Sequence, residues 1–371
     1  MVAVSSITVA GAPRRVLIVL LGSIGDVVRA LPLLGRIRLA LPDSHLAWAV
    51  EPKSEPVLRS HAWLDEVIVY DRKRAPWSFA PFLREIRCGR FDLVIDLQRH
   101  LKSGAIGWIS GAPERLGFAA GNTKEYNHLF STRQITAQPN MRLKLLQYQA
   151  FGDALGIPSA PIEFGLAPTP EETANAKRLL AGAPCPMVGV IIGSSWPSRI
   201  YPPGAVATTI RELAHPTDTC SALFPVLIGG PDEAGLVDAV MKEIEGVPTL
   251  NLVGRTSLRD LIAIFTQCAA AFGPDSGPMH MAAAVGCPVV SLWGSTAPER
   301  SAPWGFADLA IRGEIECHPC YLRRCPIGGE CMRRIDPLAV AHTVRQAVTV
   351  SGRYNDSQPG DIPVSAGEYV R

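Results

Sequence analysis

Residues 269–286 of this 371-residue chain read AAAFGPDSGPMHMAAAVG. The apolar residues 269–272 are typical of a buried strand, and the small residues that follow the polar turn predict a helix. Such a turn directs free backbone N–H groups and the positive end of a helix dipole at one point, an arrangement that binds phosphate. Alternatively, Asp275 or Ser276 has a structural role only and caps the helix.

The same pattern recurs in the second half of the chain, where buried strands end in small polar residues. The predicted strands are 187–192, 225–228 and 288–293, and the turns that follow them are Gly193–Arg199, Gly229–Pro231 and Gly294–Thr296. In a doubly wound parallel sheet the turns at the carboxyl ends of the strands form the ligand crevice. Four such turns together therefore predict nucleotide binding in this half.

The first half alternates between strands and helices in the same way. Strands are predicted at 15–21, 46–50, 67–70 and 91–97, and helices at 27–41, 82–88 and 141–155, with Pro32 kinking the first helix or shifting its start. This alternation favours a parallel, doubly wound α/β sheet. The proline-rich stretch 157–170 predicts a linker, so we expect domains at 1–165 and 166–350, with residues 1–13 and 351–371 as loose ends.

Composition narrows the class of protein. Hydrophobic residues make up 47% and charged residues 19%, which is typical of a folded globular chain. Residues 1–165 hold 20 Lys and Arg against 14 Asp and Glu, whereas residues 166–371 hold 16 against 20, so the first half favours an anionic partner. The sequence has no basic stripe interleaved with aromatic residues, so nucleic-acid binding is not predicted. We expect no membrane span or secretory signal, and nine cysteines kept reduced in the cytoplasm.

Five blocks, taken in order, resemble the ADP-heptose:lipopolysaccharide heptosyltransferases of glycosyltransferase family 9. The blocks are Gly22–Asp26 with Leu31-Pro32, Asp96-Leu97-Gln98 with Lys102-Ser103, Gly193–Arg199, Gly229–Glu233 and Pro274–Gly286. The resemblance extends from about residue 15 to about residue 348. It implies the GT-B architecture: two Rossmann-like domains facing each other across a cleft, with the acceptor on the first and the sugar nucleotide on the second.

The resemblance also implies catalytic roles. An inverting sugar transfer needs a base on the acceptor hydroxyl and stabilisation of the charge on the departing diphosphate. Asp26 matches the family's general base, although an aspartate before a helix is also an ordinary N-cap. Arg199 stands where the family usually has lysine and would offset the diphosphate charge; otherwise it is a surface arginine.

The remaining site residues divide between donor and acceptor. Asp275 would help to form the phosphate cradle, Glu233 would accept hydrogen bonds from the ribose hydroxyls, and Thr296 lies in the last donor turn. Phosphate contacts are expected from Ser195, Ser276, Gly277 and His280, although His280 could equally pack its helix. Arg99, His100 and Lys102 would bind the anionic acceptor or else form a solvated basic loop.

A cysteine-rich segment holds Cys317, Cys320, Cys325 and Cys331. These four thiols could bind a metal ion, or they could remain free in a folded loop. We expect an inverting enzyme without a cofactor, which transfers heptose from ADP-heptose to a lipopolysaccharide core acceptor and touches the cytoplasmic face of the inner membrane. The alternatives are a relative with another nucleotide sugar or acceptor, and a nucleotide-binding regulator that senses metal or redox state through these cysteines.

Overall fold

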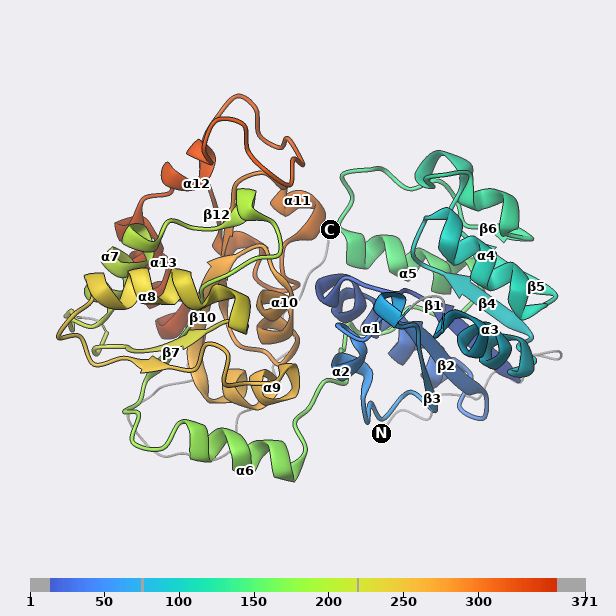
Figure 1. The fold of residues 1–371 in the computed structure, drawn as a ribbon, viewed down its shortest axis with the longest axis horizontal. Helices are drawn as coiled ribbons and strands as arrows, with labels where there is room; N and C mark the ends of the chain where they lie inside the picture. Colours follow the sequence, from blue (N-terminus) through green and yellow to red (C-terminus); the bar gives the residue numbers. More distant parts are fainter. Residues whose placement is uncertain (1–13, 75–76, 219, 352–371) are drawn as a thin grey trace. The chain divides into compact units, whose positions relative to one another are not determined.

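The structure is a computed structural model that describes residues 14–74, 77–218 and 220–351. The chain divides into two compact units between Leu166 and Ala167. Each unit contains one six-stranded parallel sheet with helices packed against it (Figure 1). The predicted loose ends, residues 1–13 and nearly all of 351–371, lie outside the described residues.

Unit 1 contains the first six strands of the chain. They are β1 (Arg15–Val19), β2 (His45–Val50), β3 (Glu66–Val69), β4 (Leu93–Asp96), β5 (Glu114–Gly117) and β6 (Arg133–Gln134). Its α-helices are α1 (Ile24–Ala40), α2 (Glu55–Leu58), α3 (Phe79–Cys88), α4 (Leu101–Ser110) and α5 (Lys144–Ala154). Short 3-10 turns follow two of the strands: η1 (Arg72–Arg74) comes after β3, and both η2 (Ala120–Asn122) and η3 (Asn127–Phe130) come after β5.

Unit 2 repeats the plan. Its strands are β7 (Met187–Ile191), β8 (Phe224–Ile228), β9 (Leu250–Asn251), β10 (Cys268–Pro274), β11 (Val289–Trp293) and β12 (Ala310–Arg312). Its longer helices are α6 (Pro170–Leu179), α7 (Pro203–Leu213), α8 (Ala234–Glu243), α9 (Leu258–Gln267), α10 (Gly277–Ala284) and α13 (Pro337–Ser351). Short helical segments are α11 (Pro298–Ser301), α12 (Glu330–Arg333), η4 (Pro197–Arg199), η5 (Pro231–Glu233) and η6 (Ala307–Leu309).

Both sheets have the strand order of a doubly wound nucleotide-binding domain. Unit 1 runs β3-β2-β1-β4-β5-β6, and unit 2 runs β12-β11-β10-β7-β8-β9, which is the same order when its strands are counted from β7. In such a sheet the chain order reverses between two central strands, and ligands bind outside the carboxyl ends of those strands. The reversal points lie between β1 and β4 in unit 1 and between β7 and β10 in unit 2.

The central strands are near-continuous apolar runs because both of their faces are covered. In β1 and β10 almost every residue is buried, and Ala269 to Ala271 of β10 are fully so. If polar and apolar residues alternated along such a strand, the polar ones would face the apolar helices on one side of the sheet. Parallel strands that are buried on both faces therefore lack this alternation. The prediction of two doubly wound parallel sheets from these runs is confirmed.

The proline in α1 does not shift the start of the helix. The sequence predicts a kink or a late start at Pro32, but α1 begins at Ile24 and continues to Ala40 with Pro32 inside it. The apolar residues around Pro32 are fully buried, so tertiary packing outweighs the cost of the missing backbone donor. None of the helices in the described part of the chain combines the length and hydrophobicity that a bilayer crossing requires.

Candidate functional site

The predicted site residues gather at the two points where the strand order reverses. In unit 1, Asp26 lies in the first turn of the helix after β1, and Arg99 follows β4. In unit 2, Arg199 lies in the turn after β7, and Asp275 follows β10. Four side chains that the sequence assigns to chemistry therefore stand at the two positions where a doubly wound sheet binds ligands.

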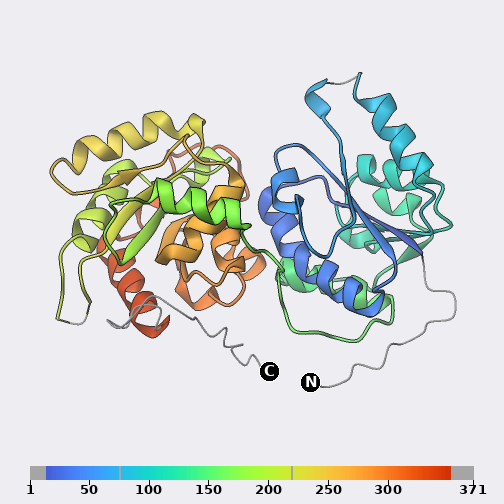
Figure 2. The ribbon, with the colours of Figure 1, turned by 90° about the horizontal axis from the view of Figure 1, so that it is seen from below.

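Asp26 is held by cations from its own helix and from α5. Its Oδ1 atom lies 2.7 Å from Arg29 Nη2 and 2.6 Å from Lys144 Nζ, and the Tyr148 hydroxyl donates to the same oxygen at 3.4 Å. Helices α1 and α5 pack side by side (Figures 1 and 2), which brings together residues more than a hundred positions apart. The N-cap interpretation is wrong, because Ser23 occupies that position and Asp26 pairs with side chains.

These cations keep Asp26 ionised. Burial acts to raise its pKa, but the charges and hydrogen bonds of Lys144 and Arg29 outweigh burial and hold the pKa well below its usual range. The neighbouring Tyr148 has a raised pKa because burial and the Asp26 charge both disfavour a phenolate, and the charges of Arg29 and Arg99 offset this only in part. The cluster is a carboxylate paired with two cations, beside a neutral phenol that also lies near Arg99.

The three predicted acceptor residues have partners within unit 1. The Arg99 guanidinium lies 3.9 Å from the centroid of the Phe118 ring and donates to Gln147 of α5. His100 lies 3.3 Å from Glu125, and Lys102 Nζ lies 3.1 Å from Glu51. Only Arg99 therefore lies close enough to Tyr148 to act on the Asp26 cluster, whereas His100 and Lys102 are paired with other carboxylates.

Asp96, at the end of β4, orders the turn that carries these residues. It is buried and accepts hydrogen bonds from Ser103 Oγ at 2.9 Å and from Asn127 Nδ2 at 2.7 Å. Burial raises its pKa, and those hydrogen bonds lower it only in part. Gln98 accepts from the Leu21 N–H at 2.7 Å, which ties the turns after β1 and β4 together.

In unit 2 the arginine and the aspartate form one pair. Arg199 Nη1 lies 3.0 Å from Asp275 Oδ2, and the guanidinium stacks 4.0 Å from the Trp196 ring centroid. The Arg199 side chain is only 15% exposed, so the interpretation as a surface arginine is wrong. A planar guanidinium held by a carboxylate and an aromatic ring has a fixed orientation, which two-pronged binding of an anion requires.

Other residues that the sequence predicts for the donor site surround this pair. Thr296 Oγ1 donates to Asp275 Oδ2 at 2.8 Å, and His280 Nε2 lies 3.9 Å from the other carboxylate oxygen. Ser276 is the N-cap residue of α10, but its side chain makes no capping bond, and its buried hydroxyl has no hydrogen-bond partner among the described residues. Because the Asp275 carboxylate engages Arg199 and Thr296, the interpretation of this turn as a simple helix cap is wrong.

The remaining donor residues stand at the ends of neighbouring strands. Ser195 is exposed in the turn after β7, and Gly277 is the first residue of α10. Glu233 accepts a hydrogen bond from the Gly230 N–H at 2.6 Å and packs where a side chain at position 193 would stand. A glycine at 193 is therefore required for Glu233 to reach the turn after β7.

The cysteine-rich segment packs against these donor turns. His318 Nδ1 donates to the Gly294 carbonyl at 2.6 Å, and the Tyr321 N–H donates to the Ser295 carbonyl at 2.8 Å. The buried Ser198 hydroxyl lies 2.9 Å from Ser295 Oγ and donates to the Leu322 carbonyl at 2.6 Å. The segment thus fixes the turns that carry Arg199 and Thr296.

The metal-binding interpretation of this segment finds no support. Burial raises the pKa of Cys331, and the other three cysteines of the segment lie near enough to raise it further. However, the described residues contain no group of three or more Cys, His, Asp or Glu side chains arranged to hold a metal ion. The cysteines of this segment are free thiols in the structure.

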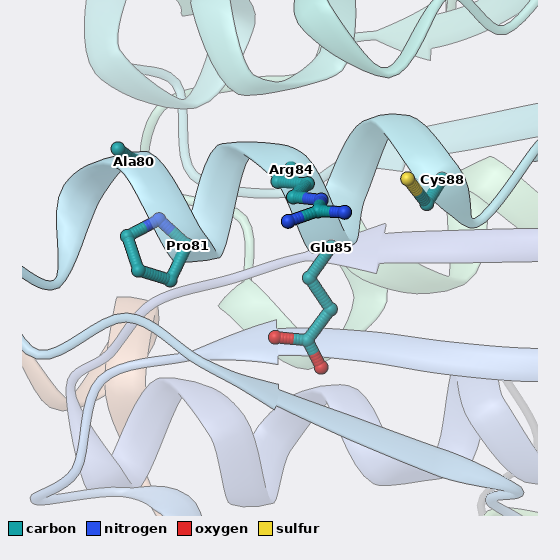
Figure 3. Close-up of a pocket in the computed structure, with 5 residues that line it drawn as sticks. All are labelled: Ala80, Pro81, Arg84, Glu85 and Cys88. Atoms are coloured by element: carbon teal, nitrogen blue, oxygen red, sulfur yellow. The ribbon is translucent and has the colours of Figure 1, made fainter.

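Two surface hollows lie away from these residues. One, of about 520 Å³, runs along the outer side of α3 and is lined by Ala80, Pro81, Arg84, Glu85 and Cys88 (Figure 3). The other, of about 730 Å³, lies against α13. Neither contains a residue that the sequence assigns to the site.

Sequence reasoning missed several residues of the site. Lys144 and Tyr148 contact Asp26 across 118 and 122 positions of the chain, and no local spacing signals either of them. Arg29 could have been found, because it lies one helical turn after Asp26. In unit 2, Ser194 donates to the Asp275 carbonyl at 2.9 Å and lies within a motif that the sequence did single out.

Two Rossmann-like units in one chain are the architecture of the GT-B glycosyltransferases, and here unit 1 carries an ionised carboxylate and unit 2 a half-buried arginine at the switch point of the sheet. A family model described as glycosyltransferase family 9 (heptosyltransferase) matches residues 80–330, and the chain belongs to this family. The resemblance found in the sequence is thereby confirmed, and the protein is a glycosyltransferase.

Known proteins agree with this assignment. The chain is 25% identical over 309 residues to the lipopolysaccharide core heptosyltransferase OpsX of Haemophilus influenzae, covering 81% of this chain and 84% of that protein. A family 9 glycosyltransferase structure from Veillonella parvula superposes with a TM-score of 0.75 at 22% identity, covering 90% and 97% of the two chains. The E. coli heptosyltransferase WaaC with ADP gives a TM-score of 0.68 at 20% identity, covering 91% and 99%.

Proposed function

We propose that the protein transfers heptose from ADP-heptose to a lipopolysaccharide core acceptor with inversion at the anomeric carbon. The observation that carries the proposal is Asp26: a half-buried carboxylate at the switch point of unit 1, held ionised by Lys144 and Arg29, in a chain that belongs to family 9. The relatives named above, a lipopolysaccharide core heptosyltransferase and a heptosyltransferase with ADP, support this donor and this acceptor.

Asp26 acts as the general base. The acceptor hydroxyl attacks the anomeric carbon, the bond from that carbon to the diphosphate breaks, and the hydroxyl proton passes to the carboxylate. A carboxylate with a strongly lowered pKa is always ionised but holds a proton weakly. Proton transfer therefore accompanies formation of the new C–O bond, because the attacking oxygen becomes acidic only as that bond forms.

Arg199 stabilises the departing ADP. The diphosphate carries two negative charges in the donor and gains one more as the bond to the sugar breaks, and a fixed guanidinium in a half-buried turn stabilises this added charge more than a solvated one does. Asp275 and Thr296 hold Arg199 in place. Ser195, Ser276, Gly277 and His280 supply the other phosphate contacts, and Glu233 accepts hydrogen bonds from the ribose.

The acceptor side of the proposal rests on unit 1. Lipopolysaccharide core sugars carry carboxylates and phosphates, and Arg99, His100 and Lys102 supply the positive charge that receives them. When the acceptor binds, its anionic groups replace Glu125 as the partner of His100 and Glu51 as the partner of Lys102. Unit 1 as the acceptor domain and unit 2 as the donor domain remain our proposal, as does peripheral contact with the inner membrane.

Product analysis with purified protein tests the function. The protein is incubated with ADP-heptose and a lipid A-linked core acceptor, and the product is identified by mass spectrometry and by the anomeric configuration of the new bond. The affinities of the protein for ADP, UDP and GDP are measured alongside by calorimetry. We expect heptosylated acceptor of inverted configuration and preference for ADP; binding of another nucleotide with no transfer from ADP-heptose would contradict the proposal.

A further inference from the structure

Trp196 lies against the guanidinium group of Arg199 in the turn after β7. The guanidinium carbon is 4.0 Å from the centroid of the Trp196 ring. At this distance the group must lie over the face of the ring, because in the plane of the ring it would clash with the ring atoms. Arg15 and Arg300 also lie over aromatic rings, but at 5.5 and 5.7 Å from the ring centroids. The contact between Trp196 and Arg199 is therefore a close stack.

The order Trp-Pro-Ser-Arg at 196–199 produces this stack. Pro197 favours extended backbone in the residue before it, and Trp196 is extended, with φ −113° and ψ 117°. The chain then turns through η4, where the Arg199 N–H donates to the Trp196 carbonyl at 3.0 Å. Ser198 is buried, and its hydroxyl is bonded to neighbouring segments. The backbone between the two stacked side chains is thus held in place.

The stack fixes the plane of the Arg199 guanidinium. Nη1 makes both contacts with Asp275, at 3.0 Å to Oδ2 and at 3.4 Å to the carbonyl oxygen. Contacts at one nitrogen locate that nitrogen, whereas a ring against the face of the guanidinium sets the plane of the whole group. All N–H groups of a guanidinium lie in its plane, so a ring on its face orients these donors without using any of them.

We propose that Trp196 is a positioning residue of the donor site, which holds Arg199 in the plane that two-pronged binding of a diphosphate requires. The inference rests on the proposed function, in which Arg199 binds ADP. It adds that the donor site is built for arginine. A lysine ammonium has no plane, so a ring beside it cannot orient its hydrogen bonds in the same way. The contribution of Trp196 therefore depends on which cation stands at position 199.

A double-mutant cycle in ADP affinity, measured by calorimetry on the full chain, tests this dependence. Trp196→Ala should lower the affinity about fivefold when Arg199 is present, and less than about twofold when it is combined with Arg199→Lys. A direct contact between Trp196 and the nucleotide would instead lower the affinity by the same factor in both backgrounds. Equal factors, or no loss in either background, would overturn the proposal.

Two further substitutions separate the aromatic face of Trp196 from its bulk. Trp196→Phe keeps an aromatic face and should retain most of the ADP affinity, whereas Trp196→Leu lacks that face and should lose as much as Trp196→Ala. Higher affinity in Trp196→Leu than in Trp196→Phe would also overturn the proposal, because Trp196 would then act through packing alone. Thermal unfolding of each variant identifies any loss of affinity that comes from a loss of folding.

The matched control is Trp108→Ala, because Trp108 is 62% exposed on α4 of unit 1. This variant should bind ADP as tightly as the native protein does. ADP binding is measured without turnover, so the cycle is independent of the transfer assay. If the cycle gave the expected coupling and no heptose were transferred, the proposed function would be contradicted and the role of Trp196 would be supported.

Discussion

Asp26 and Asp275 are both aspartates at the carboxyl edge of a central strand, and both pair with a cation, yet their surroundings differ. Asp26 faces two cations and a phenol hydroxyl, all directed at one of its oxygens. Asp275 faces one arginine and one threonine on the same oxygen, with a histidine near the other. In unit 1 the cations lower the pKa of the carboxylate, whereas in unit 2 the carboxylate holds the cation in position. In the proposed function, a pair of opposite charges thus serves as the base in one unit and as an anion site in the other.

Asp26→Asn should have the largest effect. The amide has nearly the same shape but cannot accept the proton of the acceptor hydroxyl, so kcat should fall by roughly 10²–10⁴-fold. The measurement is initial-rate kinetics with ADP-heptose and a core acceptor. A variant that keeps its turnover would place the base elsewhere.

Arg199→Ala should have the next largest effect. Loss of the fixed cation should lower turnover by about 10²–10³-fold, because charge on the leaving diphosphate is stabilised less. Arg199→Lys is the matched variant: it keeps the charge and should recover part of the loss. ADP affinity from calorimetry should fall with Ala and less with Lys; equal affinities in all three proteins would show that Arg199 does not touch the diphosphate.

Lys144→Met should change the pH dependence more than the maximal rate. The Asp26 pKa lies below its ordinary value because Lys144 and Arg29 outweigh burial. Removing one cation raises that pKa, so the carboxylate is protonated at a higher pH and activity is lost earlier on acidification. The acid limb of kcat/KM should move upward toward the ordinary aspartate range near about pH 4, so the profile is measured from about pH 8 down to about pH 3.

The control for this prediction is Lys177→Met, an exposed lysine on α6 of the other unit. Its acid limb should coincide with that of the native protein. An identical limb in Lys144→Met would mean that Lys144 does not tune Asp26 in solution.

Ser198→Ala should have the smallest effect on ADP binding. It tests whether packing of the cysteine-rich segment against the turn of Arg199 supports that binding. It leaves the buried Ser295 hydroxyl and the Leu322 carbonyl without the Ser198 hydroxyl as a partner, which should cost about 1–3 kcal/mol in the free energy of unfolding. It also frees the turn that carries Arg199, so ADP affinity should fall severalfold. Ser257→Ala removes the N-cap of α9 at a cost of about 1 kcal/mol and should leave ADP affinity unchanged. Equal ADP affinities in the two variants would show that the cysteine-rich segment does not influence ADP binding.

The sequence predicts the sheets far better than it predicts the helices between them. Apolar runs reveal the buried strands β1, β7 and β10 because both faces of each are covered. Helix α4 is missed because Gly104 and Gly107 lower its helix propensity, and it forms by packing against α3 and η3. The two-residue strands β6 and β9 are too short to leave any pattern.

Some residues of the site can be predicted from the sequence around them, whereas others depend on contacts between distant parts of the chain. Asp275, Ser276 and Thr296 can be predicted because small polar residues after a buried strand are visible in the sequence. The partners that make Asp26 a persistent anion cannot be found this way, because Lys144 and Tyr148 belong to a helix more than a hundred residues away. Only the packing of α5 on α1 brings those charges together.

The division of labour between the two units is tested most directly by measuring ADP affinity and single-turnover rate on the same preparations of two variants. Asp26→Asn should bind ADP as tightly as the native protein and fail to transfer the sugar, whereas Arg199→Ala should lose both ADP affinity and transfer. If Asp26→Asn instead lost ADP affinity while Arg199→Ala kept it, Asp26 would belong to the donor site, and the roles assigned to the two units would be wrong.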